Sequence, residues 1–205
     1  MSIVKLSNNG VKNATAFGSI TGLGSMVFIK KLTASSSSTL SFVDGSSGVT
    51  LDNSYKEYLF TFKDIHPATN SAYLTVGFRD GGTDYDAVKT TTAFVAEHNE
   101  AGNFSGLNYA SSWDLAQSTS PQPLAPAIGN QNDECCSGTL HLFNPSSTTF
   151  VKHFISNINQ YHPDDFSQNW FVAGYCNTTT AIDGVQFKMN TGNIDAGDIC
   201  LYGIA

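Results

Sequence analysis

The stretch EYLFTFKDIHPATN, residues 57–70, decides the fold class. Tyr58, Phe60 and Phe62 alternate with residues of mixed polarity, which produces one aromatic face and one mixed face. This two-residue period is typical of a β-strand with one buried face. Pro67 is expected to end the strand, because proline has no backbone N–H to donate to a neighbouring strand.

The same phrase, a strand followed by a turn, recurs along the chain as AYLTVGFRDGG (72–82), GTLHLFNPSS (138–147) and GVQFKMNTGN (184–193). We count about ten such strands, spaced about 10–15 residues apart, without a long helical period. This pattern predicts an all-β fold, a two-sheet antiparallel β-sandwich of the jelly-roll or concanavalin-like kind. The 14 Phe and eight Tyr residues can fill the layer between the sheets.

The segment 99–136 is the hardest to interpret. Its first part, NYASSWDLAQ (108–117), fits either one short helix or a strand with a bulge. Its second part, STSPQPLAPAIGNQNDECC (118–136), holds three of the six prolines and predicts a long surface loop. The stretch QYHPDDFSQN (160–169) predicts another loop.

The length of 205 residues fits one domain, or one domain with an arm. Residues 1–34 begin with a small, polar, glycine-containing stretch, so we expect an N-terminal arm or anchoring segment there. Residues 35–205 are expected to form the sandwich domain. The N-terminus shows no signal peptide and no apolar run approaches about 20 residues, so we expect synthesis in a cytosol and no membrane insertion.

Charge is sparse in this chain. Only 13% of residues are charged and the net charge is −7. The ten Lys and Arg residues are scattered, and only Lys30 and Lys31 are adjacent. Nucleic-acid binding and electrostatic binding to anionic membranes both need a basic cluster, so neither is expected.

The residues that bind metals or act as nucleophiles form no recognisable motif. The four cysteines lack zinc-ligand spacing, and Cys176 and Cys200 are expected to be small buried hydrophobes. No Gly-x-Ser-x-Gly motif accompanies the histidines, which we interpret as packed or turn residues. We therefore expect no metal and no cofactor. These residues are Cys135, Cys136, Cys176, Cys200, His66, His98, His141, His153 and His162.

Acidic residues leave two alternatives open. Asp80, Asp84 and Asp86 could hold Ca²⁺ through a flexible loop, although turn formation is the favoured interpretation. A second acidic group could supply a glycosidase pair, which needs two carboxylates about 5–9.5 Å apart. No motif carries that geometry, so we expect no catalytic residues. The members of the second group are Glu97, Glu100, Asp114 and Asp133.

Four aromatic residues lie in or beside predicted loops, namely Tyr109, Trp113, Tyr161 and Trp170. Aromatic rings in loops can stack on sugars, or they can cover the ends of a sandwich. The sequence leaves both roles open.

Four phrases together resemble a group of virion proteins of marine tailed phages, especially those of cyanobacteria. They are SSSSTLSFVDGSSGVTLDNSYKEYLFTFKDIHPAT (35–69), TTTAFVAEHNEAG (90–102), SGTLHLFNPSSTTFVKHF (137–154) and VAGYCNTTTAIDGVQFKMNTGNIDAGDICLYGI (172–204). The resemblance covers most of the chain and implies a jelly-roll or concanavalin-like sandwich on a phage particle. It carries no catalytic residues to transfer.

From the resemblance we expect a non-enzymatic virion structural protein, assembled in the host cytoplasm and exposed on the particle. It would be a short tail fibre or a capsid decoration that anchors by its N-terminal arm. Its expected partners are other virion proteins and copies of itself, with a trimer as the first expectation. The alternatives are a glycan-binding adhesin module, which would recognise host-surface glycan, and a polysaccharide-degrading enzyme.

Overall fold

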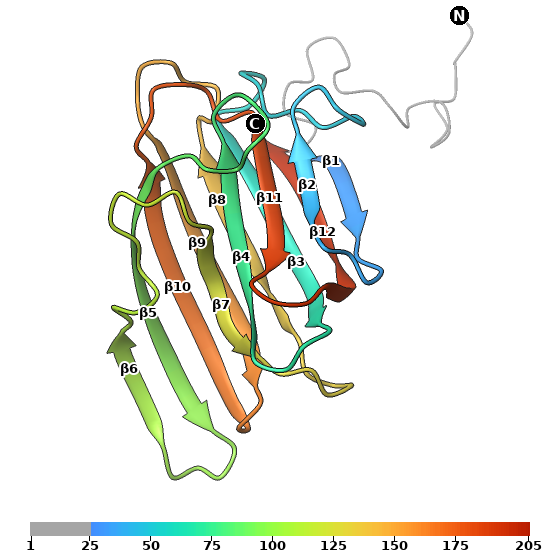
Figure 1. The fold of residues 1–205 in the computed structure, drawn as a ribbon, viewed down its shortest axis with the longest axis vertical. Helices are drawn as coiled ribbons and strands as arrows, with labels where there is room; N and C mark the ends of the chain where they lie inside the picture. The colour runs from blue at the N-terminus through green and yellow to red at the C-terminus, as the bar shows by residue number, and fades with distance from the viewer. Residues whose placement is uncertain (1–25) are drawn as a thin grey trace, which may run out of the picture.

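A computed structural model describes residues 26–205, and this part of the chain contains twelve β-strands and no helix (Figure 1). The strands are β1 (Met26–Thr33), β2 (Leu40–Val43), β3 (Glu57–Pro67), β4 (Ala72–Arg79), β5 (Lys89–Asn99), β6 (Ser105–Tyr109), β7 (Gln122–Ile128), β8 (Cys136–Phe143), β9 (Lys152–His162), β10 (Phe166–Cys176), β11 (Gly184–Met189) and β12 (Ile194–Ile204).

The strands form two antiparallel sheets, which confirms the predicted β-sandwich. The larger sheet has eight strands in the order β1-β12-β3-β8-β9-β10-β5-β6, and the smaller has four in the order β2-β11-β4-β7. Figure 1 shows the small sheet lying in front of the large one and covering only part of it. The large sheet therefore has one face toward the small sheet, here called the inner face, and one outer face.

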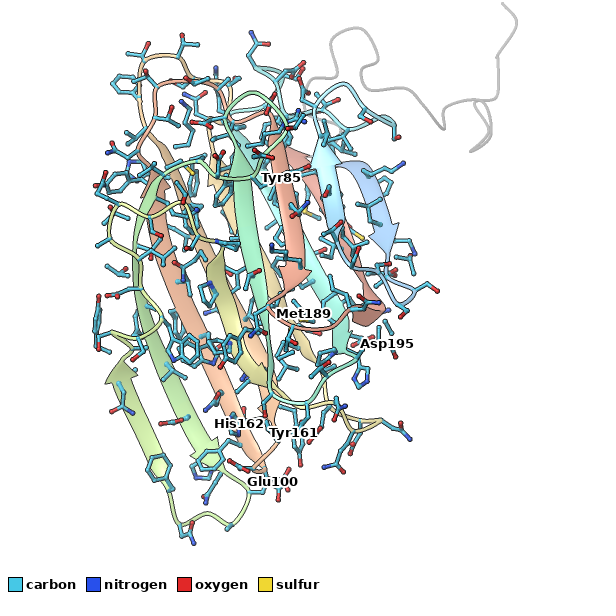
Figure 2. All side chains as sticks on the ribbon, viewed as in Figure 1. Tyr85, Glu100, Tyr161, His162, Met189 and Asp195 are labelled. Atoms are coloured by element: carbon cyan, nitrogen blue, oxygen red, sulfur yellow. The ribbon has the colours of Figure 1, made fainter. Side chains whose placement is uncertain are left out.

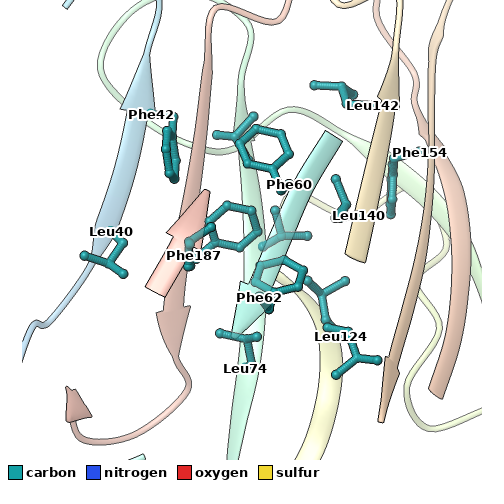
Figure 3. Close-up of a cluster of buried hydrophobic side chains, with 14 of the residues drawn as sticks. Leu40, Phe42, Phe60, Phe62, Leu74, Leu124, Leu140, Leu142, Phe154 and Phe187 are labelled. Carbon is teal, nitrogen blue, oxygen red and sulfur yellow. The ribbon is translucent and has the colours of Figure 1, made fainter. Parts of the chain in front are cut away.

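The core lies between the sheets and is built on the aromatic face that the sequence predicts. Tyr58, Phe60 and Phe62 of β3 are buried, and alternate residues of the strand are more exposed. Phe187 of the small sheet meets Phe60 and Phe62 edge to face, with ring centroids 5.3 and 5.1 Å apart (Figure 3). Phe42 adds a further ring, 5.3 Å from Phe60. Edge-to-face pairs of this kind add to the stabilisation that burial itself provides.

The prediction of a long surface loop over residues 118–136 is wrong. Residues Gln122–Ile128 form β7, and Leu124, Ala125 and Ile128 are completely buried. The strand tolerates its two prolines because it lies at the edge of the small sheet and pairs with β4 alone. The preceding segment 108–117 forms the end of β6 and a series of turns, not a helix.

The prediction of a loop over residues 160–169 is also wrong, because the connection is much shorter than predicted. β9 continues to His162 and β10 begins at Phe166, so the connection is a tight turn. Asp165 adopts a left-handed φ of 60° within that turn. Proline at position 163 marked the turn correctly, but the polar residues around it continue both strands.

The N-terminal arm predicted for residues 1–34 lies partly outside the described residues, which begin at position 26. Of its described part, Met26–Thr33 form β1, which pairs with β12 at one edge of the large sheet. Ala34 is buried in the core. These residues therefore belong to the sandwich.

Two buried lysines lie at the end of the sandwich where β5 begins. Lys89 and Lys152 flank Cys176 in the sheet register, and all three side chains are fully buried. Lys89 Nζ donates to the Ser120 carbonyl at 2.8 Å, and Lys152 Nζ donates to the Thr180 carbonyl at 2.5 Å. The two lysines thereby hold the loops that cover this end of the core, and burial lowers the pKa of both.

The Cys176 thiol makes folding sensitive to alkali. Burial raises its pKa to about 12, against 9.0 for an ordinary thiol, although the two lysines act in the opposite direction. The unfolded chain therefore releases this proton at lower pH than the folded chain. The stability that the neutral thiol contributes is complete below pH 9 and is lost as the pH rises toward 12.

From this shift we expect the free energy of unfolding to fall by on the order of 2 kcal/mol between about pH 8 and pH 10.5 because of Cys176 alone. In Cys176→Ala the fall should be smaller by that amount. Urea unfolding of both proteins across this pH range measures the difference, and below about pH 8 the two curves should run parallel. Equal alkaline slopes in the two proteins would contradict the assignment to Cys176.

Gly138 allows β8 and β9 to approach closely. A Cβ atom at this position would lie 2.2 Å from the Asn157 carbonyl oxygen and 2.6 Å from Ile158 Cα, both on the neighbouring strand. Because these are backbone atoms, the strands would have to move apart. Gly138→Ala should therefore lower the free energy of unfolding by about 2–3 kcal/mol, as overpacking does in other cores.

The matched control for this substitution is Gly106→Ala. There the nearest atom to the added methyl group is the Asn108 side-chain amide nitrogen at 2.9 Å, on an exposed side chain that can move at the cost of one surface hydrogen bond to Glu97. Urea denaturation should show a loss within about 0.5 kcal/mol for the control. Equal losses in the two variants would show that the close approach at Gly138 is unimportant.

Candidate ligand-binding groove

The candidate site lies where the large sheet extends beyond the small one. β7, the last strand of the small sheet, packs over β9 and β10, so the inner faces of β5 and β6 have no strand above them. The segment after β6 covers the first half of β5, where the buried Thr91 Oγ1 accepts from the Leu115 N–H at 2.7 Å and donates to Gln122 Oε1 at 2.6 Å. The second half of β5 stays open and forms the floor of a groove.

The groove is a solvent-open hollow of about 330 Å³. Its walls come from five strands and from the turn that follows β6. The lining residues are Val95, Glu97, Asn108, Tyr109, Ala110, Ser111, Ser112, Trp113, Pro126, Ala127, His162, Gln168 and Trp170.

Two aromatic side chains meet in the groove, and a third aromatic residue, Tyr109, lies at its rim. The rings of Trp113 and Trp170 are perpendicular, with centroids 6.4 Å apart, and Trp113 also packs against Tyr73 at 4.7 Å. Trp170 is largely buried, whereas Tyr109 is 60% exposed at the rim. The Tyr109 hydroxyl donates to Asp114, and this hydrogen bond raises the pKa of Tyr109. The groove therefore offers one fixed indole wall and one accessible phenol.

A chain of hydrogen bonds holds the polar floor in place. Glu97 Oε1 accepts from Asn108 Nδ2 at 3.2 Å, and Glu97 Oε2 accepts from Gln168 Nε2 at 3.0 Å. Gln168 Oε1 in turn accepts from Gln160 Nε2 at 3.0 Å and from Trp170 Nε1 at 3.3 Å. These bonds fix the amide and indole orientations before any ligand arrives, which lowers the entropic cost of binding.

The wall opposite the carboxylate is formed by a bulge in β7. Ala127 has a left-handed φ of 59°, unusual for a residue with a side chain, and the register with β4 shifts in this strand. The carbonyl groups of Pro126 and Ala127 accept hydrogen bonds from Gln160 Nε2. Backbone strain is often found at functional sites, where the surrounding structure holds it in place.

The charge in the groove is negative. Among the residues that line the groove, Glu97 is the one with a carboxylate, and none is Lys or Arg. His162 lies at the margin, with Nδ1 3.8 Å from an oxygen of the exposed Asp164. Such a site would repel an anionic ligand and favours one that is neutral and rich in hydroxyl groups.

Comparison with known proteins adds no identity: no family model, no curated protein and no solved structure matches this chain.

The sequence predicted several of these residues, although not their grouping. Of the four aromatic candidates, Tyr109, Trp113 and Trp170 line the groove. Tyr161 lies apart and lines a separate hollow of about 270 Å³ together with Glu100. Figure 2 shows Tyr161, His162 and Glu100 near the same end of the molecule.

The acidic candidates separate in the same way. Glu97 lies in the groove, Asp114 bonds to Tyr109, and Glu100 and Asp133 lie elsewhere. Sequence analysis missed the floor residues Asn108 and Gln168. The signal for Gln168 was present, because it precedes Trp170 by two residues and therefore shares its face of a strand.

The remaining candidates do not assemble into a metal site. Within residues 26–205, no three His, Cys, Asp or Glu side chains are grouped so that they could hold a metal ion. The four cysteines are all free, and His141 on β8 pairs with Glu57 at 2.6 Å. The described part of the chain also contains no helix that could cross a membrane.

Proposed function

We propose that this protein is a non-enzymatic surface component of a virion and that its groove binds a host-surface glycan. The observation that carries the proposal is the contact of Trp113 with Trp170 above a fixed polar floor in one open groove, with Tyr109 at the rim. The place on a virion rests on the sequence resemblance. The binding function rests on the groove.

A sugar ring has apolar C–H faces and polar edges, and the groove provides partners for both. The C–H faces can lie against the Trp113 ring, where burial of apolar surface is favourable. Hydroxyl groups can donate to Glu97, whose two oxygens each use only one of their lone pairs in the hydrogen bonds described. Asn108 and Gln168 hold that carboxylate in place.

The groove is better suited to binding than to hydrolysis. A glycosidase uses two carboxylates separated by about 5–9.5 Å, one of them as an acid. Glu97 is the one carboxylate side chain among the lining residues, and amide groups hold both of its oxygens. A single carboxylate held in this way favours glycan binding over the alternative of a polysaccharide-degrading enzyme.

The purified chain should bind a subset of immobilised neutral host-surface glycans on an array and release no reducing sugar from them. Absence of binding to any host-surface glycan would reject the groove function. Release of reducing sugar would replace it with the enzymatic alternative.

The virion placement needs a separate test. Antibodies against this chain should label intact particles, and the position and copy number of the label distinguish a tail fibre from a capsid decoration. Particles that lack the chain entirely would reject the virion part of the proposal while leaving the groove function standing.

A further inference from the structure

We propose that two copies of this chain associate through the outer face of the eight-stranded sheet, forming a two-fold symmetric dimer. The proposed dimer does not depend on glycan binding. Eight large apolar side chains remain exposed in residues 26–205. Of these eight, five project from the large sheet on the side away from the core, namely Met26, Phe28, Phe94, Leu107 and Ile155.

The strand register places these side chains in a continuous surface. Directly paired residues of antiparallel strands lie on the same face. One cross-strand row therefore runs Phe28, Tyr202, Leu59, His141, Ile155, Ala173, Thr92. The next row runs Lys31, Cys200, Thr61, Thr139, Asn157, Phe171, Phe94.

These two rows contain one charged residue, Lys31 at the β1 end of the second row, and it already forms an ion pair with Asp198 at 3.1 Å. Beside them, Glu57 is already paired with His141. A chain with a net charge of −7 would repel a second copy of itself over most of its surface. A face on which the few charged side chains are already paired is where two such copies can approach without bringing like charges together.

The face has both projections and hollows. The rings of Phe94 and Phe171 stack in parallel with centroids 4.7 Å apart, and Ile155 is 52% exposed beside them. Two hollows of about 290 and 370 Å³ adjoin these side chains, the second reaching Tyr175. Because the projections and the hollows belong to one face, two copies related by a two-fold axis can fill each other's hollows.

The size of the face is sufficient for a stable dimer. The sheet is eight strands wide at about 4.8 Å per strand, and the two rows together with the neighbouring row of Met26, Ile204 and Glu57 span about 20 Å, which gives a footprint of about 750 Å². A standard protein interface buries about 800 Å² on each partner. A single self-complementary face produces a dimer, whereas a ring of three would need two different surfaces on each copy. We therefore infer a dimer in place of the trimer expected from the sequence.

This arrangement leaves the groove free. The groove lies on the inner face of the sheet, so the two grooves of a dimer would open on opposite sides of the dimer.

Sedimentation velocity of the full chain over a wide concentration range tests the dimer. We expect a species of twice the 21.9-kDa chain mass for the wild-type protein. Phe94→Glu and Ile155→Glu should each sediment as monomers, because they place charge at the centre of the face. Thr92→Arg, at an exposed position in the first row, provides the same test with less risk to folding.

The matched control is Phe150→Glu, which adds the same charge at a 70% exposed phenylalanine in the loop before β9. It should remain dimeric, and thermal melts should show all four variants folded. A wild-type protein that is monomeric at every concentration, or trimeric, would overturn the proposal. So would a dimer that survives all three substitutions on the face.

Discussion

Phe187→Ala is expected to lower the free energy of unfolding by about 3–5 kcal/mol, the usual cost of removing a buried phenylalanine ring. Phe187 is fully buried and contacts Phe42, Phe60 and Phe62 edge to face, so its ring joins the small sheet to the large one. Domains of this size are stabilised by only about 5–15 kcal/mol in total. The variant should therefore unfold at a much lower urea concentration.

The control for this prediction is Phe150→Ala. It removes the same ring from a 70% exposed position and should change the free energy of unfolding by less than about 0.5 kcal/mol. Equilibrium urea unfolding of the two variants and the wild type makes the comparison. A loss below about 1 kcal/mol for Phe187→Ala would mean that the two sheets are not held together at this cluster.

The second large effect concerns the groove. Trp113→Ala should weaken binding of a glycan identified on the array by at least about 30-fold, the loss that corresponds to about 2 kcal/mol at a tryptophan hot spot. The ring supplies the apolar wall, and no other side chain can replace it. Isothermal titration calorimetry measures the affinity, and Trp113→Phe should recover part of it.

Two further variants separate binding from folding. Glu97→Gln keeps the shape of the floor and removes the charge, so we expect about a fivefold loss, because hydrogen bonds to charged groups are about 1 kcal/mol stronger than neutral ones. Tyr161→Ala alters the separate hollow and should leave the affinity unchanged. If Tyr161→Ala reduces the affinity as strongly as Trp113→Ala does, the ligand binds elsewhere.

Alternation was the most reliable signal in the sequence. Tyr58, Phe60 and Phe62 were predicted to share a buried face, and they do, because burial of one face imposes a period of two on any strand. β7 was not predicted, because its prolines at 123 and 126 are typical of a loop. They are compatible with strand pairing only because β7 lies at the edge of the small sheet.

The sequence indicates some of the residues that line the groove, but not that they lie together. Trp113 and Trp170 were candidates because aromatic rings near loops often bind ligands, but they are 57 residues apart and no local pattern joins them. Their meeting depends on strand order, since β7 covers β9 and β10 and leaves β5 open. Alternation determines the faces of a strand and not its neighbours, so this information is absent from local sequence.

The composition of the chain provides a direct test of the central claim. Its sequence contains two tryptophans, Trp113 and Trp170, and both line the groove. Their indole N–H signals in a ¹H–¹⁵N correlation spectrum therefore report on the groove alone. On titration with the glycan identified on the array, both signals should shift. The dissociation constant fitted to these shifts should equal the value found by calorimetry. A glycan that binds while both indole signals stay unchanged would contradict the assignment of the groove as the binding site.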